Sequence, residues 1–387
     1  MLLKNVYIFK QGGNASQIEI KDTRITAVVS TNENKIESPD QSVINFSDAV
    51  AFPGLINSHD HLEFNLYPQL GNRFYNDYVE WGNDIHDKNN DQIEKIKRIP
   101  YELRFRWGLY KNLLCGITTV VNHGTGEIYY YNRLPEVFTN YNYIHSIRLE
   151  KNWKLRLNIV SNGKPFVIHV GEGVNKNSID EIDKLLQWNI FHKKIIGVHG
   201  ISMNSNQSEN FQSLIWCPNS NLFLYNKTAD IPALKKKTKI LFGTDSTLSA
   251  DWNFWNHIRL AKKMNYLNDE ELYNSITTNA AEIWKMNLIG SILPGKTADI
   301  LIIKKKIKND WESFYDTNPE DILLIIKHGA IVFIDAGLAE EQSVINLQDF
   351  DLISIKTIRK YVTKGIIELM ETIKGFIPEY EFPFSIG

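Results

Sequence analysis

The sequence predicts an α/β fold in which buried parallel strands alternate with helices, together with a small β-domain built from both ends of the chain. From about residue 50 to 287, short apolar runs alternate with stretches of helical spacing, the pattern of a parallel sheet covered by helices. Residues 1–50 hold short β-branched runs separated by turn residues, with no convincing helical pattern. Residues 289–345 return to this strand-like texture, so we expect the two ends to share one β-domain.

The strands of the N-terminal part are rich in Val and Ile, which favour extended structure. They are VYIF (6–9), QIEI (17–20), ITAVVS (25–30) and SVINF (42–46). Near the other end, residues 323–334 (LLIIKHGAIVFI) have the same texture. Residues 346–387 are expected to add one amphipathic helix over about 355–375 and an aromatic tail.

The central part supplies runs that are apolar on both faces, as expected of strands covered by helices on either side. They are AFPGLIN (51–57), GITTVVNH (116–123), FVIHVGEG (166–173), IIGVHGI (195–201), LIWCPNS (214–220) and ILFGTDS (240–246). Residues 92–114 have helical spacing. Ser178 with Glu181 predicts a capping box at the start of a second helix. Asn268 and Glu271, also three apart, mark the start of a third.

Composition narrows the class of protein. The chain has 387 residues, with 43 Lys and Arg against 45 Asp and Glu, and this balance disfavours nucleic acid as a partner. No apolar run approaches the roughly 18–20 residues that span a bilayer, and the N-terminus lacks a signal-peptide cleavage site. Two cysteines, Cys115 and Cys217, are too few for a disulfide framework. We therefore expect a cytoplasmic protein with a small-molecule partner, and a homo-oligomer is left open.

Histidines and one aspartate stand where apolar strands stop. His59 and His61 are two apart at a strand end, so both side chains point to the same side. His169, His199 and Asp245 end three further runs. In a parallel barrel all these ends lie on one rim, where active sites are built. Three of these histidines and the aspartate, around an open position, suit a catalytic Zn²⁺ or another borderline divalent metal.

One carboxylate and five further histidines lie outside this set of strand-end residues. Glu172 lies three residues past His169 on the loop leaving that strand, where it can transfer protons without binding the metal. A lone histidine is more often structural than a ligand, and that interpretation is given to the histidines away from the strand ends. They are His86, His145, His192, His257 and His328.

Six motifs in order carry a resemblance to a known family. They are PGLINSHDHLE (53–63), HVGE (169–172), VHG (198–200), CPNSNLFL (217–224), GTDS (243–246), and TTNAAEIWKM (277–286) followed by IGSILPGKTADILII (289–303). The chain resembles the amidohydrolase superfamily in its cytosine-deaminase, guanine-deaminase and chlorohydrolase-like branch. The resemblance implies a TIM-type (β/α) barrel over 51–288 and a composite β-sandwich of residues 1–50 and 289–345. The stretch between His123 and Ile168 is short for two complete strand–helix units. The third or fourth strand of the barrel is therefore expected to be degenerate.

The resemblance also implies roles for individual residues. His59, His61, His169 and Asp245 would hold the metal, and Asp245 would also take a proton from the attacking water. His199 would orient that water, and Glu172 would carry a proton to the substrate nitrogen. Binuclear relatives use a carbamylated lysine on the fourth strand. No lysine stands at a clear strand end between residues 124 and 165, so one ion is expected, Zn²⁺ first and Fe²⁺ or Mn²⁺ as alternatives.

The implied activity is hydrolysis of a non-peptide C–N bond of a small nitrogen-containing molecule, by deamination or by opening a cyclic or linear amide. Two alternatives stay open at this point. One is a metal-free homologue that keeps the fold for a structural role. The other is hydrolysis of a C–Cl, C–S or phosphoester bond at the same site, since loops and site decide the chemistry on a shared fold.

Candidate substrate contacts come from the segment after His61 and from two further residues. Residues 63–86 are aromatic and amide-rich, typical either of a loop packed over the barrel mouth or of a substrate lid. The lid residues would be Trp81, Tyr75 and Tyr78. His123, at the end of its strand, faces the pocket or packs structurally. Arg148, expected at the end of the one clear strand between residues 124 and 165, YNYIHSIRLE (141–150), binds a carboxylate or carbonyl of the substrate or makes an ordinary ion pair.

Overall fold

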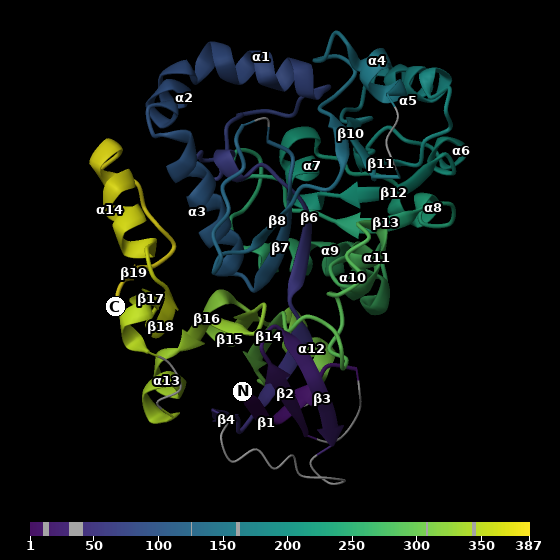
Figure 1. Cartoon of the computed structure of the whole chain (residues 1–387). Coiled ribbons are helices and arrows are strands. Elements are labelled where there is room, and N and C mark those ends of the chain that lie inside the picture. The colour runs from purple at the N-terminus through teal and green to yellow at the C-terminus, as the bar shows by residue number, and fades with distance from the viewer. Residues whose placement is uncertain (11–14, 31–41, 125, 160–162, 307–308, 343–345) are drawn as a thin grey trace.

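The computed structural model describes residues 1–10, 15–30, 42–124, 126–159, 163–306, 309–342 and 346–387 (Figure 1). The parts of the expected β-domain at 11–14, 31–41, 307–308 and 343–345 lie outside these ranges. Figure 1 shows a β-rich region around the N-terminus and, above it, a larger region in which strands and helices alternate. The domain division that the sequence pattern suggests, with its boundaries, stays a prediction.

The larger region contains two parallel arcs of strands. Among the described residues, a three-stranded arc runs in the order β6-β7-β8 and a five-stranded arc in the order β13-β12-β11-β10-β9. Their bounds are β6 Leu55–Asp60, β7 Ile117–Asn122, β8 Glu136–Phe138, β9 Asn142–Ile144, β10 Phe166–Val170, β11 Ile195–His199, β12 Phe211–Trp216 and β13 Lys239–Phe242. The two three-residue strands, β8 and β9, lie in the short stretch where a degenerate strand is expected from the sequence.

The last strand of one arc comes close to the first strand of the other. The carbonyl oxygen of His59 accepts hydrogen bonds from the backbone N–H groups of Thr244 and Asp245, both at 3.1 Å. In the described part of the chain, however, no strand ladder joins β13 to β6 or β8 to β9. The closed barrel therefore stays a prediction, although the strand ends that carry the candidate site lie together.

Helices follow most of these strands and cover them. Their bounds are α1 Tyr78–Lys88, α2 Asn90–Lys97, α3 Tyr101–Leu113, α4 Trp153–Asn158, α5 Lys176–Trp188, α6 Ser205–Ser208, α7 Pro218–Tyr225, α8 Ile231–Leu234, α9 Phe254–Met264, α10 Asp269–Ser275 and α11 Thr278–Ile283. The helix expected over 92–114 is in fact two helices, because Pro100 separates α2 from α3. The capping box at Asn268 and Glu271 is confirmed.

The predicted capping box at Ser178 and Glu181 is wrong. Helix α5 begins earlier, and the side chain of Asn175 caps it by accepting the backbone N–H of Ser178 at 3.1 Å. The carboxylate of Glu181 instead accepts the backbone N–H of Gly171 at 2.7 Å. This contact ties α5 to the loop that follows β10.

The β-rich region joins both ends of the chain in one sheet. Among the residues described, eleven strands take part, in the order β19-β17-β18-β16-β15-β14-β5-β1-β2-β3 with β4 beside β1. Their bounds are β1 Leu2–Ile8, β2 Ser16–Lys21, β3 Arg24–Ser30, β4 Val43–Asn45, β5 Ala49–Pro53, β14 Ile300–Lys304, β15 Ile322–Lys327, β16 Ala330–Asp335, β17 Phe350–Ile355, β18 Ile358–Thr363 and β19 Ser385–Ile386. β5 pairs with β1 on one side and with β14 on the other. The predicted sharing of one β-region is thus observed, and the sandwich arrangement stays a prediction.

The C-terminal part differs from the expected helix over 355–375. Residues 350–363 form the antiparallel hairpin β17–β18, and helix α14 (Ile366–Phe376) begins only afterwards. Lys356, in the turn, has a left-handed φ of 53°. Lysine is not a residue that signals such a turn, and the sequence pattern therefore does not reveal the hairpin. Two short helices complete this end of the chain, α12 Asp310–Tyr315 and α13 Ala336–Gln342.

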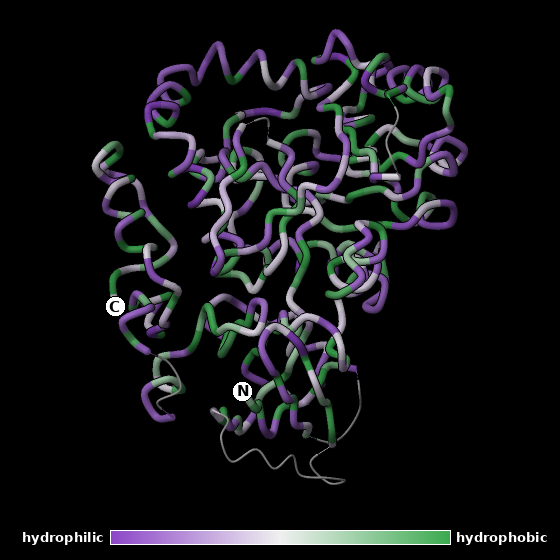
Figure 2. The backbone as a smooth tube through the Cα atoms, viewed as in Figure 1, coloured by the Kyte–Doolittle hydropathy of each residue, from purple (hydrophilic) through white to green (hydrophobic). Residues whose placement is uncertain are grey.

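The hydropathy of the backbone follows this architecture. In Figure 2 the hydrophilic colour dominates α1 and α2 at the outer edge, while apolar stretches run through the strands. All residues of β6, β7, β10 and β11 are buried. Throughout the described ranges, no helix combines the length and apolar character needed to cross a lipid bilayer.

The shared sheet makes a prediction about truncation. A fragment spanning only residues 50–288 lacks β1 and β14, the partners of β5. Unpaired apolar strand edges promote association, so we expect this fragment to aggregate where the full chain stays dispersed. Size-exclusion chromatography with circular dichroism checks this, and a monodisperse, folded fragment would contradict the composite β-domain.

Candidate metal centre

Four strand ends bring imidazoles and a carboxylate together. His59 lies in β6 and His61 directly after it, His169 lies in β10, His199 ends β11, and Asp245 follows β13. All five residues are buried. The Nε2 atoms of His59 and His169 are 3.3 Å apart. Oδ1 of Asp245 lies 3.9 Å from Nε2 of His59 and 3.9 Å from Nε2 of His61. The period-two expectation for His59 and His61 is confirmed, because both reach the same carboxylate oxygen.

The donor atoms are spaced as a divalent metal requires. Ligand atoms of His59, His61 and His169 lie within 4.8 Å of one another, as do those of His59, His199 and Asp245. A tetrahedral Zn²⁺ with bonds of about 2.0–2.1 Å places its ligand atoms about 3.4 Å apart. The observed separations of 3.3 and 3.9 Å are close to this value. The residues present therefore fit a zinc-type ion.

The protonation states also suit metal binding. Burial, and then the neighbouring imidazoles, hold the pKa of His59 and of His169 well below the usual value. Both rings are therefore neutral and keep a lone pair for a ligand bond. Burial would raise the pKa of Asp245, but His61, His199 and hydrogen bonds from Ser220 and the Ser246 backbone outweigh it and leave a lowered pKa. Asp245 is thus ionised.

Outer contacts fix the orientation of these groups. Nδ1 of His169 lies 2.9 Å from the carbonyl oxygen of His145, and Nδ1 of His199 lies 2.9 Å from the amide oxygen of Asn221. The hydroxyl of Ser220 donates to Oδ2 of Asp245 at 2.8 Å. Such contacts on the far side of a ligand set its tautomer and aim it at a metal.

Two residues of the site carry backbone strain. His199 has φ 69° and Asp245 has φ 60°, in the left-handed region that side chains other than glycine rarely adopt. Strained backbone of this kind persists where the surroundings enforce it and clusters at functional sites.

Glu172 lies beside the cluster in a buried position. It follows β10 by two residues, is 6% exposed, and its Oε2 is 3.7 Å from Nε2 of His199. The hydroxyl of Tyr225 donates to its Oε1 at 3.0 Å. Burial raises the pKa of Glu172, and His199 opposes this only in part. The carboxyl group can therefore hold a proton nearer neutral pH than an exposed glutamate can.

The aromatic segment after His61 packs over the Glu172 loop. The backbone N–H of Tyr78 donates to the carbonyl of Glu172 at 3.3 Å, and that of Val174 donates to the carbonyl of Asn76 at 2.7 Å. The segment is not all loop, because its end forms α1. The polar atoms of the three aromatic residues make hydrogen bonds within the protein, from Trp81 to the Leu70 carbonyl, from Tyr75 to Asp84 and from Tyr78 to Glu181. Direct substrate contact by these residues stays a prediction.

Arg148 does not end a strand. β9 stops at Ile144, and β8 is a second strand between residues 124 and 165, so the expected single strand over 141–150 is wrong. The guanidinium group lies 2.9 Å from Oδ2 of Asp77 and 3.2 Å from Oε2 of Glu181. Its carbon lies 4.4 Å from the centre of the Tyr78 ring. The ion-pair alternative is therefore the contact observed, and a substrate contact stays a prediction.

Two further histidines lie against the cluster. The ring of His145 stacks on that of His169 with centroids 4.6 Å apart, so His145 lies against the cluster, and its structural interpretation stays a prediction. Nδ1 of His123 contacts Nδ1 of His59. Burial lowers the pKa of His145 to about 4 and holds that of His123 well below its usual value. Nε2 of His123 and Nδ1 of His145 are buried without a protein partner in the part of the chain described, as is typical of atoms that face a ligand or water.

A buried ion pair holds the end of β6 that carries His59. Nζ of Lys111 lies 3.0 Å from Oδ2 of Asp60, and both side chains are fully enclosed. Amide groups complete the network, with Asn112 donating to Oδ2 of Asp60 at 2.8 Å and Asn65 to Oδ1 at 2.9 Å. Asp60 lies between His59 and His61 in the chain, so this network holds the strand end that carries both imidazoles.

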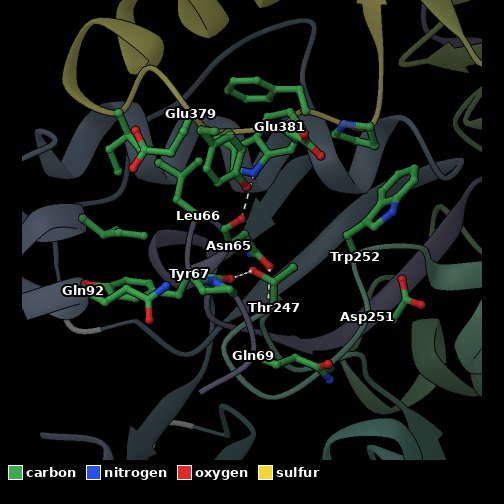
Figure 3. Close-up of a pocket in the computed structure, with 18 of the residues that line it drawn as sticks. Asn65, Leu66, Tyr67, Gln69, Gln92, Thr247, Asp251, Trp252, Glu379 and Glu381 are labelled. Carbon is green, nitrogen blue, oxygen red and sulfur yellow. Dashed lines mark hydrogen bonds between the residues drawn. The ribbon is translucent and has the colours of Figure 1, made fainter. Parts of the chain in front are cut away.

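A large cavity lies next to this network (Figure 3). It has a volume of about 1020 Å³ and is bounded by residues 65–69, helix α2, residues 247–252 and the C-terminal residues 379–383. The Thr247 hydroxyl donates to the carbonyl of Tyr67 at its wall. Neither the site imidazoles, nor Glu172, nor Asp245 lines it. This cavity is therefore distinct from the candidate metal centre.

His257 is buried apart from the cluster and gives a pH prediction. Its Nε2 lies 2.8 Å from the carbonyl oxygen of Asp251, and burial lowers its pKa to about 4. Above pH 6.5 the His257 ring is mostly unprotonated in both the folded and the unfolded state. Between pH 6.5 and 4 only the unfolded chain does, so the folded state loses stability, by roughly 2 kcal/mol between pH 7 and 5. Urea unfolding at both pH values should show a smaller loss in His257→Gln than in the wild type, and equal losses would contradict this.

With the geometry described, the chain can be compared with known proteins. The model of the amidohydrolase family matches residues 153–332. This match confirms the predicted resemblance to the amidohydrolase family. Over 174 residues the chain is 27% identical to guanine deaminase of Escherichia coli (strain K12), covering 42% of this chain and 38% of that protein. Over 200 residues it is 25% identical to 5-methylthioadenosine/S-adenosylhomocysteine deaminase of Caldicellulosiruptor saccharolyticus, covering 46% of this chain and 45% of that protein.

Solved structures share the fold of this chain. An adenosine deaminase from Xanthomonas campestris with bound zinc superposes with a TM-score of 0.73 at 14% identity, over 98% of both chains. Atrazine chlorohydrolase from Arthrobacter aurescens complexed with zinc gives a TM-score of 0.67 at 15% identity, over 88% of this chain and 99% of that one. The sequence match to the two deaminases above spans less than half of their length.

Proposed function

We propose that the chain is a metal-dependent hydrolase that cleaves a non-peptide C–N bond of a small nitrogen-containing molecule, by deamination or by amide hydrolysis. The observation that carries the proposal is the convergence of His59, His61, His169 and Asp245 with Glu172 beside them. The amidohydrolase family match and the similarity to two deaminases support the reaction class. The zinc complexes of two proteins with the same fold support the choice of metal.

In this proposal His59, His61, His169 and Asp245 hold one divalent ion, zinc by preference, with Fe²⁺ or Mn²⁺ as alternatives. A divalent ion bound there would lower the pKa of a water from 15.7 to about 7–9 and so supply a nucleophile near neutral pH. The chain's own groups hold and move the protons. Nε2 of His199 orients the attacking water, and the ionised Asp245 accepts its proton.

The two carboxylates of the site divide the acid and base roles. The pKa of Asp245 is lowered by its hydrogen bonds and imidazole neighbours, whereas burial raises that of Glu172. A pair of titratable groups whose pKa values are pushed apart in this way supplies a base and an acid at the same pH. Glu172, anchored by Tyr225, therefore delivers a proton to the leaving nitrogen.

One alternative has an observation in its favour. The similarity in fold to atrazine chlorohydrolase allows the same site to displace chloride instead of an amine. A metal-free structural homologue is the less favoured alternative, because such a protein has no need to keep all four donor groups and Glu172 converged and buried.

The proposal is tested by assaying ammonia or amine release from zinc-loaded protein. The panel should contain purines, pyrimidines, cyclic ureas and N-acyl amines, with a chlorinated triazine to test the alternative. We expect release of ammonia or amine from at least one compound, lost when a chelator removes the metal and restored by Zn²⁺. Chloride release alone would favour the chlorohydrolase alternative, and turnover that persists after metal removal would contradict the proposal.

A further inference from the structure

His59 is held from both sides of its ring. Its Nε2 faces the other donor atoms, 3.3 Å from Nε2 of His169 and 3.9 Å from Oδ1 of Asp245. Its Nδ1 contacts Nδ1 of His123, which follows the neighbouring strand β7. The ring of His59 is fully buried and that of His123 nearly so. Solvent therefore does not compete for the contact between the two Nδ1 atoms.

The contact constrains where the ring hydrogens lie. A neutral imidazole carries one N–H and one lone pair. A histidine that gives its Nε2 lone pair to a metal carries its hydrogen on Nδ1, and this N–H needs an acceptor on the far side of the ring. For His59 the acceptor in contact is Nδ1 of His123, whose own hydrogen must then be on Nε2.

We propose that His123 is a positioning residue, which accepts the Nδ1–H of His59 and so holds that ring with its Nε2 lone pair toward the metal position. The inference rests on the proposed metal site. Two other imidazoles of the cluster have acceptors of a different kind, since His169 uses the backbone carbonyl of His145 and His199 uses the amide oxygen of Asn221. His59 depends on a side chain from the adjacent strand, and this support can be removed by substitution without changing any proposed ligand.

The structure offers a matched set of variants. His123→Leu removes the acceptor, whereas His123→Asn keeps an oxygen near the position of Nδ1. His257→Leu is the control, because its ring is also buried but lies apart from the cluster, with its Nε2 2.8 Å from the carbonyl oxygen of Asp251. Each variant is compared with the wild type in the metal-free state by thermal unfolding.

The readout is the dissociation constant for Zn²⁺ itself, measured by competition with a chelating dye. Loss of an outer partner of a metal ligand costs about 10–100-fold in metal affinity. We expect this loss in His123→Leu, and affinities within about threefold of the wild type in His123→Asn and His257→Leu. Wild-type affinity in His123→Leu would overturn the positioning role and leave the metal site intact. No zinc binding by the wild type would overturn the metal site itself, and the positioning role with it.

A second measurement does not depend on how the variants fold. Long-range ¹H–¹⁵N correlation spectra of the zinc-loaded wild type report the tautomer of each histidine ring. We expect His59 as the Nδ1–H tautomer and His123 as the Nε2–H tautomer. Hydrogen on Nδ1 of His123 would overturn the proposal, because that nitrogen could not then accept from His59.

Discussion

Glu172→Gln should lower turnover on the true substrate by about 10²–10⁴-fold, the usual contribution of a positioned general acid or base. The substitution keeps the size and polarity of the side chain and removes its ability to transfer a proton. The carboxylate is anchored by Tyr225 and lies 3.7 Å from Nε2 of His199, and it is not one of the proposed ligands. Zinc content and thermal stability should therefore change little.

The measurement is kcat together with zinc content for the wild type and the variant. Glu209→Gln is a suitable control, because its carboxylate pairs with Lys237 at the exposed surface and should leave both quantities unchanged. Loss of zinc in Glu172→Gln would make Glu172 a ligand instead of a proton carrier. Full activity with full zinc content would mean that Glu172 takes no part in the reaction.

Asp60→Asn should destabilise the protein by about 3–5 kcal/mol, the usual effect of breaking a buried ion pair on one side. Nζ of Lys111 lies 3.0 Å from the Asp60 carboxylate inside the protein, and it would lose its only charged partner in the described part of the chain. An asparagine would also turn an N–H₂ group toward amide donors, because Asn65 and Asn112 both donate to Asp60.

Urea unfolding of the metal-free protein measures this effect. Asp60→Asn combined with Lys111→Met should be less destabilising than Asp60→Asn alone, because the second change removes the unpaired charge. Lys97→Met is the surface control, since Lys97 and Glu94 form an exposed pair of the kind that contributes at most about 1 kcal/mol. If Asp60→Asn costs no more than this control, the buried network does not stabilise the strand end.

The donor residues of the site were predictable because strand geometry decides where they point. His59 and His61 share a side through the period of two, and His169, His199 and Asp245 are placed by the alternation of strands and helices. The supporting contacts were not predictable in the same way. Asp60 meets Lys111 from a separate helix, and Tyr225 reaches Glu172 from α7. These pairs depend on how elements pack across long sequence separations, which local patterns do not encode.

The fold, like the site, has parts that local sequence patterns predict and parts that they do not. The alternating central runs and the β-rich ends appear as expected, because hydrophobic periodicity and β-branched residues signal them directly. The sequence pattern predicts a helix across part of the hairpin β17–β18, since the turn at Lys356 has none of the residues that mark a left-handed turn. Likewise, β8 and β9 have three residues each, too few to show a period.

Elemental analysis of protein purified without chelator tests the central claim most directly. We expect close to one divalent ion per chain, mainly zinc, because the donor atoms of His59, His61, His169 and Asp245 converge at the strand ends. Replacing His59 and His61 together by alanine should abolish this metal while the double variant still folds. Equal metal in the wild type and the double variant would place the ion elsewhere and contradict the account.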